Sequence, residues 1–294
     1  MQLRTLGNDI VGRVEVGAVG LGLMTFDQTG TQPREQLLDT VRAALDVGVT
    51  LFDTADAYGP GDERGSGAQG ENERLIRSLL DELGVRDRVL VATKGGHVRT
   101  EGGGWDTDSS PAHLHRAVDA SLQRLGVDRI DLWQHHRPDP EVGDAETFGT
   151  LAEIAGSGKV ARIGLSNVDP GQIRAAHDVL GGHLVSVQNE FSPQFRSSRA
   201  EIDVCEELGL AFLPWSPLGG LSDAKELAER HPAFAEVADA RGVSAQQVAI
   251  AWELAQSPVV IPIPGAKRPS SIRDSAAAAD LELTDEEIAR LDRE

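Results

Sequence analysis

The sequence predicts an α/β protein folded as a closed barrel of eight β/α units, and three observations predict it. Short β-branched apolar runs alternate with longer amphipathic stretches, eight such pairs follow one another, and no shift in composition separates them. Strands that alternate with helices form a parallel sheet. Eight units within 294 residues fit a (β/α)8 TIM barrel. We therefore expect a single domain over residues 1–294.

The expected elements can be placed in order along the chain. The predicted strands and the helical segments that follow them are 18–22 and 33–47, 49–52 and 71–83, 88–93 and 109–126, 130–135 and 145–156, 160–166 and 170–180, 184–188 and 198–208, 210–215 and 223–256, and 259–263 and 269–279. Helix starts carry capping signals: a serine before Pro111, Asp169, and Thr284 for a C-terminal helix. Residues 2–17 predict an N-terminal β-hairpin that turns at Gly7 and Asn8 and plugs the barrel.

A doubly wound open sheet is the main alternative architecture. Its dinucleotide-binding form has the pattern G-x-G-x-x-G directly after the first strand. Here the corresponding stretch is GLGLMT, residues 20–25, which does not complete that pattern. The barrel is therefore favoured.

Composition limits the classes of partner. With 47 acidic and 28 basic residues the net charge is −19, which argues against nucleic acid and anionic membrane, because both require a positive surface. The single cysteine, Cys205, allows no intramolecular disulfide, and no apolar run has the length of a signal peptide or a membrane span. We expect a cytoplasmic protein that acts on a small molecule. Monomer and homo-oligomer are equally open.

Polar residues end three neighbouring strands, where the chemistry of a (β/α)8 barrel lies. Asp53 and Tyr58, the only tyrosine, follow the second strand, Lys94 follows the third, and His135 and His136 end the fourth. An ammonium beside a phenol stabilises the phenolate and lowers its pKa from the usual value of about 10, and a carboxylate keeps that ammonium charged. These residues predict proton donation to a carbonyl oxygen, with the pKa of Tyr58 below its usual value.

Many segments in the right order resemble the aldo-keto reductase family over essentially the whole chain. They are GVTLFDTADAYG, VATKGG, LGVDRIDLWQHHRPDP, GKVARIGLSN, VQNEFSP, LPWSPLGG and IPIPGAKRPSSI. The resemblance implies reduction of an aldehyde or ketone by NADPH, without a metal, and a catalytic tetrad of Asp53, Tyr58, Lys94 and His136. The family usually has an apolar residue where this chain has His135. Because neighbours on a strand face opposite sides, we expect His135 to pack behind the barrel wall.

The same resemblance implies the groups that bind the cofactor, NADPH or NADP+. Ser166, Asn167 and Gln188 resemble the partners of the nicotinamide carboxamide. Trp215 stands where the family commonly has a tyrosine that stacks on the nicotinamide, and an indole also offers a flat face. The other expected contacts are Gly22, Leu23, Met24, Asp53, Ser216, Leu218, Gly219, Gly265, Lys267, Arg268, Ser271, Asp274 and Ser275.

Two adjacent cations, Lys267 and Arg268, favour a 2′-phosphate and therefore NADP over NAD. Ser275 replaces the asparagine often found in this motif, which weakens the implied contact to the adenine. The glycine-rich stretches 59–70 and 95–108 are expected to be loops at the rim of the pocket, with Trp105 as a candidate substrate platform.

Two other functions compete with carbonyl reduction. A Schiff-base lyase using Lys94 requires a lysine with a depressed pKa. A cofactor-sensing regulatory or binding subunit would bind NADPH with little turnover. The sequence leaves a simple aldehyde, a ketone and a keto-sugar open as substrates.

Overall fold

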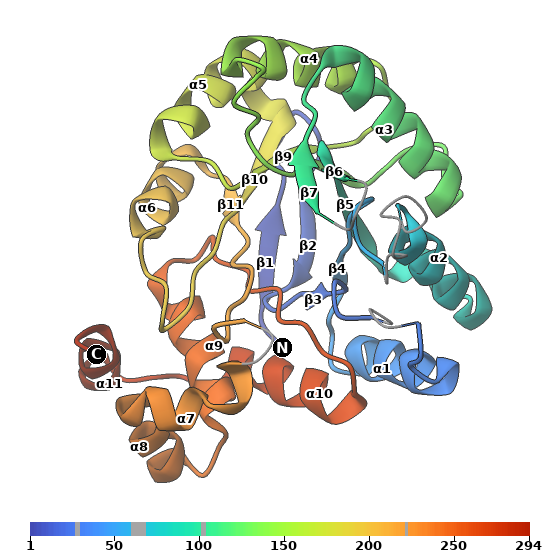
Figure 1. Ribbon diagram of the computed structural model, residues 1–294. Coiled ribbons are helices and arrows are strands. Elements are labelled where there is room, and N and C mark those ends of the chain that lie inside the picture. Colours follow the sequence, from blue (N-terminus) through green and yellow to red (C-terminus); the bar gives the residue numbers. More distant parts are fainter. Residues whose placement is uncertain (27–29, 60–68, 101–103, 221–222) are drawn as a thin grey trace.

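A computed structural model of the protein describes residues 1–26, 30–59, 69–100, 104–220 and 223–294. Helices surround a central parallel sheet, whose strands run in the order β11-β10-β9-β8-β5-β4-β3 (Figure 1). The strands are β3 (Leu21–Gly22), β4 (Leu51–Asp53), β5 (Leu90–Gly95), β8 (Leu132–His135), β9 (Ile163–Ser166), β10 (Leu184–Gln188) and β11 (Ala211–Phe212). Each strand pairs in parallel with the next strand of the sheet along the chain, as expected for successive β/α units.

The eighth expected strand, 259–263, closes the ring without forming a regular strand. Single bridges join this part of the chain to β11 on one side and to β3 on the other. The amides of Gly20 and Gly22 donate to the carbonyl oxygens of Pro262 and Pro264 at 2.8 and 3.0 Å. Because proline has no N–H, neither proline can return a bond to β3. The barrel prediction is confirmed, with an incomplete ladder at its closure.

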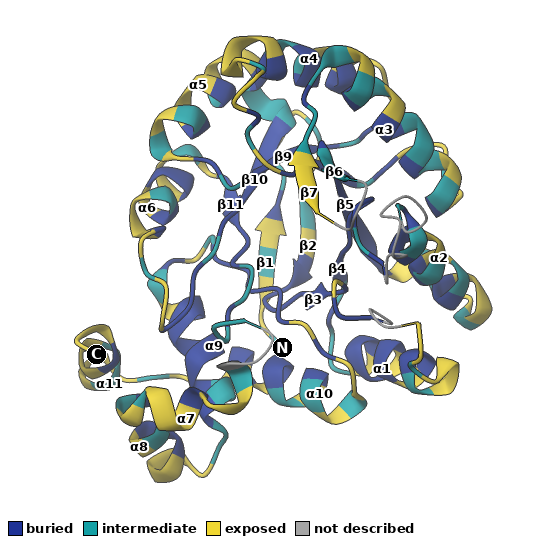
Figure 2. Ribbon diagram, in the orientation of Figure 1, coloured by how far each residue is buried: buried dark blue, intermediate teal, exposed yellow. Residues whose placement is uncertain are grey.

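Helices pack around the outside of the sheet, with their buried faces turned inward and their exposed faces outward (Figure 2). They are α1 (Arg34–Asp46), α2 (Glu71–Leu83), α3 (Pro111–Leu125), α4 (Asp144–Gly156), α5 (Pro170–Leu180), α6 (Arg199–Leu208), α7 (Leu227–Arg230), α8 (Pro232–Arg241), α9 (Ala245–Gln256), α10 (Pro269–Ala277) and α11 (Asp285–Asp292). The predicted caps are confirmed, since the side chains of Ser110, Asp169 and Thr284 accept from backbone amides at the starts of α3, α5 and α11. None of the described helices is long and apolar enough to cross a membrane.

The segment 223–256, expected to be helical, contains three α-helices, α7, α8 and α9. Pro232 occupies the first turn of α8, and Gly242 ends that helix with φ 67°. A proline starts a helix readily but cannot continue one, and glycine adopts the left-handed conformation without strain. These two residues therefore set the bounds of α8.

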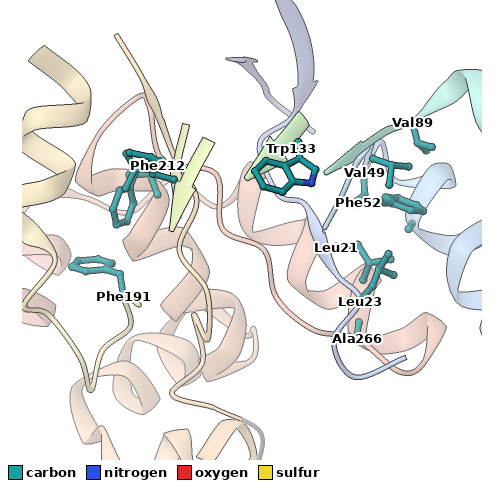
Figure 3. Packing of buried hydrophobic residues seen from close by; sticks show 14 of the residues in the cluster. Leu21, Leu23, Val49, Phe52, Val89, Trp133, Phe191, Phe212 and Ala266 are labelled. Atoms are coloured by element: carbon teal, nitrogen blue, oxygen red, sulfur yellow. The ribbon is translucent and has the colours of Figure 1, made fainter. Parts of the chain in front are cut away.

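Two hydrophobic clusters hold the barrel together. The larger lies between the sheet and the helices and includes Phe52, Trp133 and Phe212 (Figure 3). The smaller fills the barrel interior with side chains such as Leu51 and Leu132. Burial of a large apolar side chain contributes about 1.5–3 kcal/mol, so both layers stabilise the strand ends that carry the site.

The N-terminal hairpin supplies part of the interior cluster. β1 (Leu3–Leu6) and β2 (Val14–Gly17) are antiparallel, and Leu6 and Val16 pack with the interior side chains. The plug is therefore confirmed. The tight turn predicted at Gly7 and Asn8 is wrong, because residues 7–13 connect the strands and the Asn8 side chain accepts from the amides of two later residues.

The glycine-rich stretch 95–108 is not only loop, which corrects the prediction. β6 (His97–Arg99) and β7 (Trp105–Thr107) form a small antiparallel sheet after β5. It places an aromatic and a cationic side chain at the rim of the barrel. Of the other glycine-rich stretch, 59–70, residues 60–68 lie outside the described residues.

Candidate active site

A cavity of about 1110 Å³ opens at the carboxyl ends of the strands. Most of the predicted site residues line it: Gly22, Met24, Asp53, Tyr58, His136, Ser166, Asn167, Gln188, Trp215, Ser216, Leu218, Gly265, Lys267, Arg268, Ser271, Asp274 and Ser275. Gly219 is not among the lining residues. Leu23 is not among the lining residues, and its side chain packs in the hydrophobic core near Ala266 (Figure 3). Lys94 lies beneath the cavity, fully buried.

A buried ion pair forms the floor of the site. Asp53 ends β4 and pairs in register with Ala92 of β5, and Lys94 comes two residues later on the same face. The Lys94 ammonium donates to Asp53 Oδ2 at 2.6 Å and to the carbonyl oxygen of Thr54 at 2.9 Å. Burial lowers the pKa of Lys94, but Asp53 and Tyr58 outweigh it and the pKa lies above its usual value. The lysine is therefore charged.

The second oxygen of Asp53 is also satisfied. Oδ1 accepts from the side-chain amides of Gln134 at 3.1 Å and Gln188 at 2.9 Å. These glutamines come from β8 and β10, so strands on several sides of the barrel hold one carboxylate in place. A buried carboxylate with this many donors keeps its orientation.

Tyr58 lies on the turn after β4 and reaches the ion pair. The Lys94 ammonium donates to its hydroxyl oxygen at 3.3 Å and lies 4.9 Å from the ring centroid. Burial raises the pKa of Tyr58, the charge of Lys94 opposes this, and the pKa lies above its usual value. The predicted fall in this pKa is therefore wrong, because removing the phenol from water costs the phenolate more than one ammonium restores. Tyr58 holds its proton at neutral pH.

The two adjacent histidines face opposite sides, as predicted. His136 lines the cavity, with its ring centroid 5.7 Å from that of Tyr58. Burial, followed by the charge of Lys94, holds the pKa of His136 well below its usual value, so the ring is neutral. His135 is buried behind the wall, where Nε2 lies 2.8 Å from Ser109 Oγ.

Sequence reasoning named Trp105 as a candidate substrate platform but missed the side chains that stack on it beside His136. The ring of His97 stacks on Trp105 with centroids 4.6 Å apart and meets His136 edge-on at 4.9 Å. The Arg99 guanidinium covers Trp105 at 4.2 Å from its centroid. Arg137, which also lines the cavity, was missed as well. It directly follows His136 in the motif HHRPDP, and that adjacency could have identified it.

One side of the cavity has a donor set that fits a phosphate. Lys267, Arg268 and Ser271 line it around the start of α10, where backbone N–H groups point outward. The carbonyl oxygen of Lys267 accepts from the side chains of Gln32 and Gln36, each at 2.8 Å, which ties this loop to α1. An ammonium, a guanidinium and a hydroxyl at a helix start are the groups that bind phosphate oxygens.

Unusual backbone conformations mark another part of the wall. Asn167 and Ser216 have φ of 59° and 51°, a region that side-chain-bearing residues rarely adopt and that often marks functional sites. Asn167 is held there because its amide donates to the His136 carbonyl oxygen at 3.0 Å and to Ser166 Oγ at 2.9 Å. Trp215 also lines the cavity, and its buried indole N–H has no hydrogen-bond partner among the described residues.

Comparisons with known proteins identify the family of this chain. The sequence model of the aldo/keto reductase family matches residues 18–293. The 6-dehydroglucose reductase of Novosphingobium aromaticivorans is 36% identical over 272 residues, 90% of this chain and 87% of that protein. Pyridoxine 4-dehydrogenase of Escherichia coli is 34% identical over 295 residues, 98% and 96% of the two chains. The crystal structure of an aldo-keto reductase from Klebsiella pneumoniae in complex with NADPH matches with a TM-score of 0.80 and 27% identity, covering 100% of this chain and 95% of that one.

The fold and the site define an oxidoreductase built on a (β/α)8 barrel. The chain belongs to the aldo/keto reductase family.

Proposed function

We propose that the protein reduces a small aldehyde or ketone to the alcohol with NADPH, and that Tyr58 donates the proton. The observation that carries this proposal is the Tyr58 hydroxyl 3.3 Å from the Lys94 ammonium at the floor of the cavity. The family membership and the NADPH bound by the Klebsiella structure support the cofactor. The names of the two relatives, a sugar-derivative reductase and a pyridoxine dehydrogenase, support a small polar substrate.

Three residues of the site, His136, Tyr58 and Lys94, would each have a separate role in the reduction. When bound, the nicotinamide supplies the hydride that adds to the carbonyl carbon. Neutral His136, with its proton on Nε2, would donate a hydrogen bond to the carbonyl oxygen and orient it. Tyr58 would transfer its hydroxyl proton to that oxygen as negative charge develops there. Lys94, held charged by Asp53 at 2.6 Å, would stabilise the phenolate that remains.

Lys267, Arg268 and Ser271 would bind the 2′-phosphate of NADPH, and Trp215 would stack on the nicotinamide ring. The side-chain N–H groups of Asn167 and Gln188 already donate to protein acceptors. Their side-chain oxygens would therefore accept hydrogen bonds from the carboxamide of the nicotinamide. Ser216 and Leu218 would border the pyrophosphate. These contacts fit the donors that the cavity wall presents.

The cofactor assignment predicts a preference for NADPH over NADH. A hydrogen bond to a charged group contributes about 1.5–3 kcal/mol, so the dissociation constant for NADPH should be lower than that for NADH by at least about tenfold. Lys267→Ala combined with Arg268→Ala should remove most of this preference. Quenching of tryptophan fluorescence measures both constants.

The control for this prediction is Arg273→Ala. Arg273 lies on the same helix, but it is exposed and pairs with Asp46 at 3.2 Å, so its loss should leave both constants within about twofold of the wild type. Equal affinities for the two cofactors in the wild type would contradict the assignment of the two cations.

Turnover separates this proposal from its competitors. A panel of aldehydes and ketones, followed by the loss of NADPH absorbance, should show steady-state oxidation of NADPH. Tight NADPH binding without turnover on any carbonyl would favour a cofactor-sensing subunit. Trapping of Lys94 by borohydride with a carbonyl compound would favour the Schiff-base lyase, which the raised pKa of Lys94 argues against.

A further inference from the structure

Arg137 is a cation at the substrate end of the cavity that the proposed chemistry does not use. It follows His136 directly, beyond the end of β8, and its exposed side chain lines the cavity. Within the described part of the chain, its guanidinium makes no hydrogen bond or ion pair with a protein group. A guanidinium carries five N–H donors in a planar fork, so this one is available to a ligand.

The surroundings of Arg137 place it beside the reacting groups. Burial is the largest influence on the pKa of Tyr58, of His97 and of His136, and the charge of Arg137 acts on each of them in addition. Burial raises the pKa of the Glu190 carboxyl, and the charge of Arg137 opposes this rise, but the described structure shows no ion pair between the two side chains. Arg137 follows His136 directly in the chain and lines the same cavity as Tyr58 and His97, so its charge faces the cavity that holds the phenol and the imidazoles.

The order of the strands separates Arg137 from the phosphate-binding donors. Along the closed ring, β8 is the fourth strand and the segment 260–265 takes the eighth place, between β11 and β3. Arg137 follows the fourth strand, whereas Lys267 and Arg268 follow the eighth, so they leave opposite sides of the barrel mouth. A phosphate held by the pair at the eighth strand would not occupy the guanidinium at the fourth.

The charge of the cavity differs in sign from that of the whole protein. The chain has a net charge of −19, but the described lining residues include four Lys or Arg residues and two Asp residues. Asp53 is neutralised by Lys94, and Asp274 accepts from Ser244 at 2.6 Å beside α10. The cavity lining also includes aromatic side chains, with Tyr58 and Trp105 as examples.

We propose that Arg137 binds an oxyanion of the substrate, a carboxylate or a phosphate ester, while the carbonyl group lies at Tyr58 and His136. The substrate class is then carbonyl compounds that carry a negative charge. A planar fork of donors matches the oxygens of either group. This inference deepens the proposed reduction and rests on it.

The test compares charged and neutral substrates that share one carbonyl group. The first pair is 4-carboxybenzaldehyde and methyl 4-formylbenzoate, and the second is glyceraldehyde 3-phosphate and glyceraldehyde. The ratio of kcat/KM for the charged to the neutral member is measured in the wild type, in Arg137→Gln and in Arg137→Lys. Arg129→Gln is the matched control, because Arg129 is an exposed arginine before the other end of β8.

The wild type should prefer the charged member of at least one pair, and the preferred pair distinguishes carboxylate from phosphate. Arg137→Gln should lower that ratio by on the order of 10- to 100-fold, mainly through a higher KM of the charged substrate. Arg137→Lys should lose less, and Arg129→Gln should keep the wild-type ratio.

Two results would overturn the inference, and they differ from failure of the proposed function. If the wild type and Arg137→Gln show the same ratios of kcat/KM for both pairs, Arg137 does not bind the charged group of the substrate. If Arg137→Gln weakens NADPH binding in fluorescence titrations while the ratios stay constant, the guanidinium serves the cofactor instead. If the wild type reduces no aldehyde at all, the proposed function itself fails and this inference fails with it.

Discussion

Tyr58→Phe is expected to lower kcat for carbonyl reduction by at least about 100-fold. The substitution removes one oxygen, the only group of Tyr58 that contacts Lys94 through a hydrogen bond, and keeps the ring that packs edge-on against His136. The hydride donor would still be bound, but the developing alkoxide would have no acid. Loss of NADPH absorbance at saturating aldehyde measures kcat.

Ser109→Ala is the control for this variant. It also removes a single buried hydroxyl, and this one contacts His135 behind the barrel wall rather than His136 in the cavity. Its kcat should stay within a few fold of the wild type, and NADPH affinity should be similar in both variants. A Tyr58→Phe protein that keeps more than about a tenth of wild-type kcat would exclude Tyr58 as the general acid.

Lys94→Met is expected to lower the free energy of unfolding by about 3–5 kcal/mol. Lys94 and Asp53 are both buried, with 0% and 2% of their surfaces exposed. Removing the ammonium leaves a carboxylate whose remaining side-chain donors, among the described residues, are the amides of Gln134 and Gln188. Carbonyl reduction should be largely lost as well, since the phenolate of Tyr58 would have no counter-charge. Urea unfolding followed by circular dichroism measures the stability.

The double variant Lys94→Met with Asp53→Asn shows whether the isolated charge is the cause. An asparagine side chain at position 53 can still accept hydrogen bonds from the two glutamines. Because it is neutral, it leaves no unpaired charge in the core. We expect the double variant to recover part of the lost stability but none of the activity. If Lys94→Met alone unfolds at the wild-type urea concentration, the ion pair does not stabilise the barrel floor.

Much of the fold could be predicted because each β/α unit carries its own local signal. The helix over residues 71–83 and the strand over 184–188 were placed with the bounds that the structure shows. The closure of the barrel was harder, because Pro262 and Pro264 sit in an apolar run that otherwise resembles a strand. The β6–β7 sheet was missed because its strands have only three residues each. The glycines of 95–108 predict a loop rather than such short strands.

The site could be predicted in part, because strand order brings residues at strand ends together. That rule placed Asp53 and Lys94 on neighbouring strands, and the structure joins them at 2.6 Å. The direction of the Tyr58 pKa was wrong because sequence does not show how completely a side chain leaves water. Arg137 was missed because a single charge after a strand also begins many solvated loops. The sequence did not show that the side chain of Leu23 enters the core while its neighbours Gly22 and Met24 line the cavity.

The most direct measurement of the central claim follows the hydride itself. The wild-type protein is incubated with an aldehyde and with NADPH that carries deuterium at the transferable position of the nicotinamide, and the alcohol is analysed by mass spectrometry. Carbonyl reduction predicts one deuterium on the former carbonyl carbon for each NADPH consumed. Alcohol without deuterium, or consumption of NADPH without alcohol, would contradict the account.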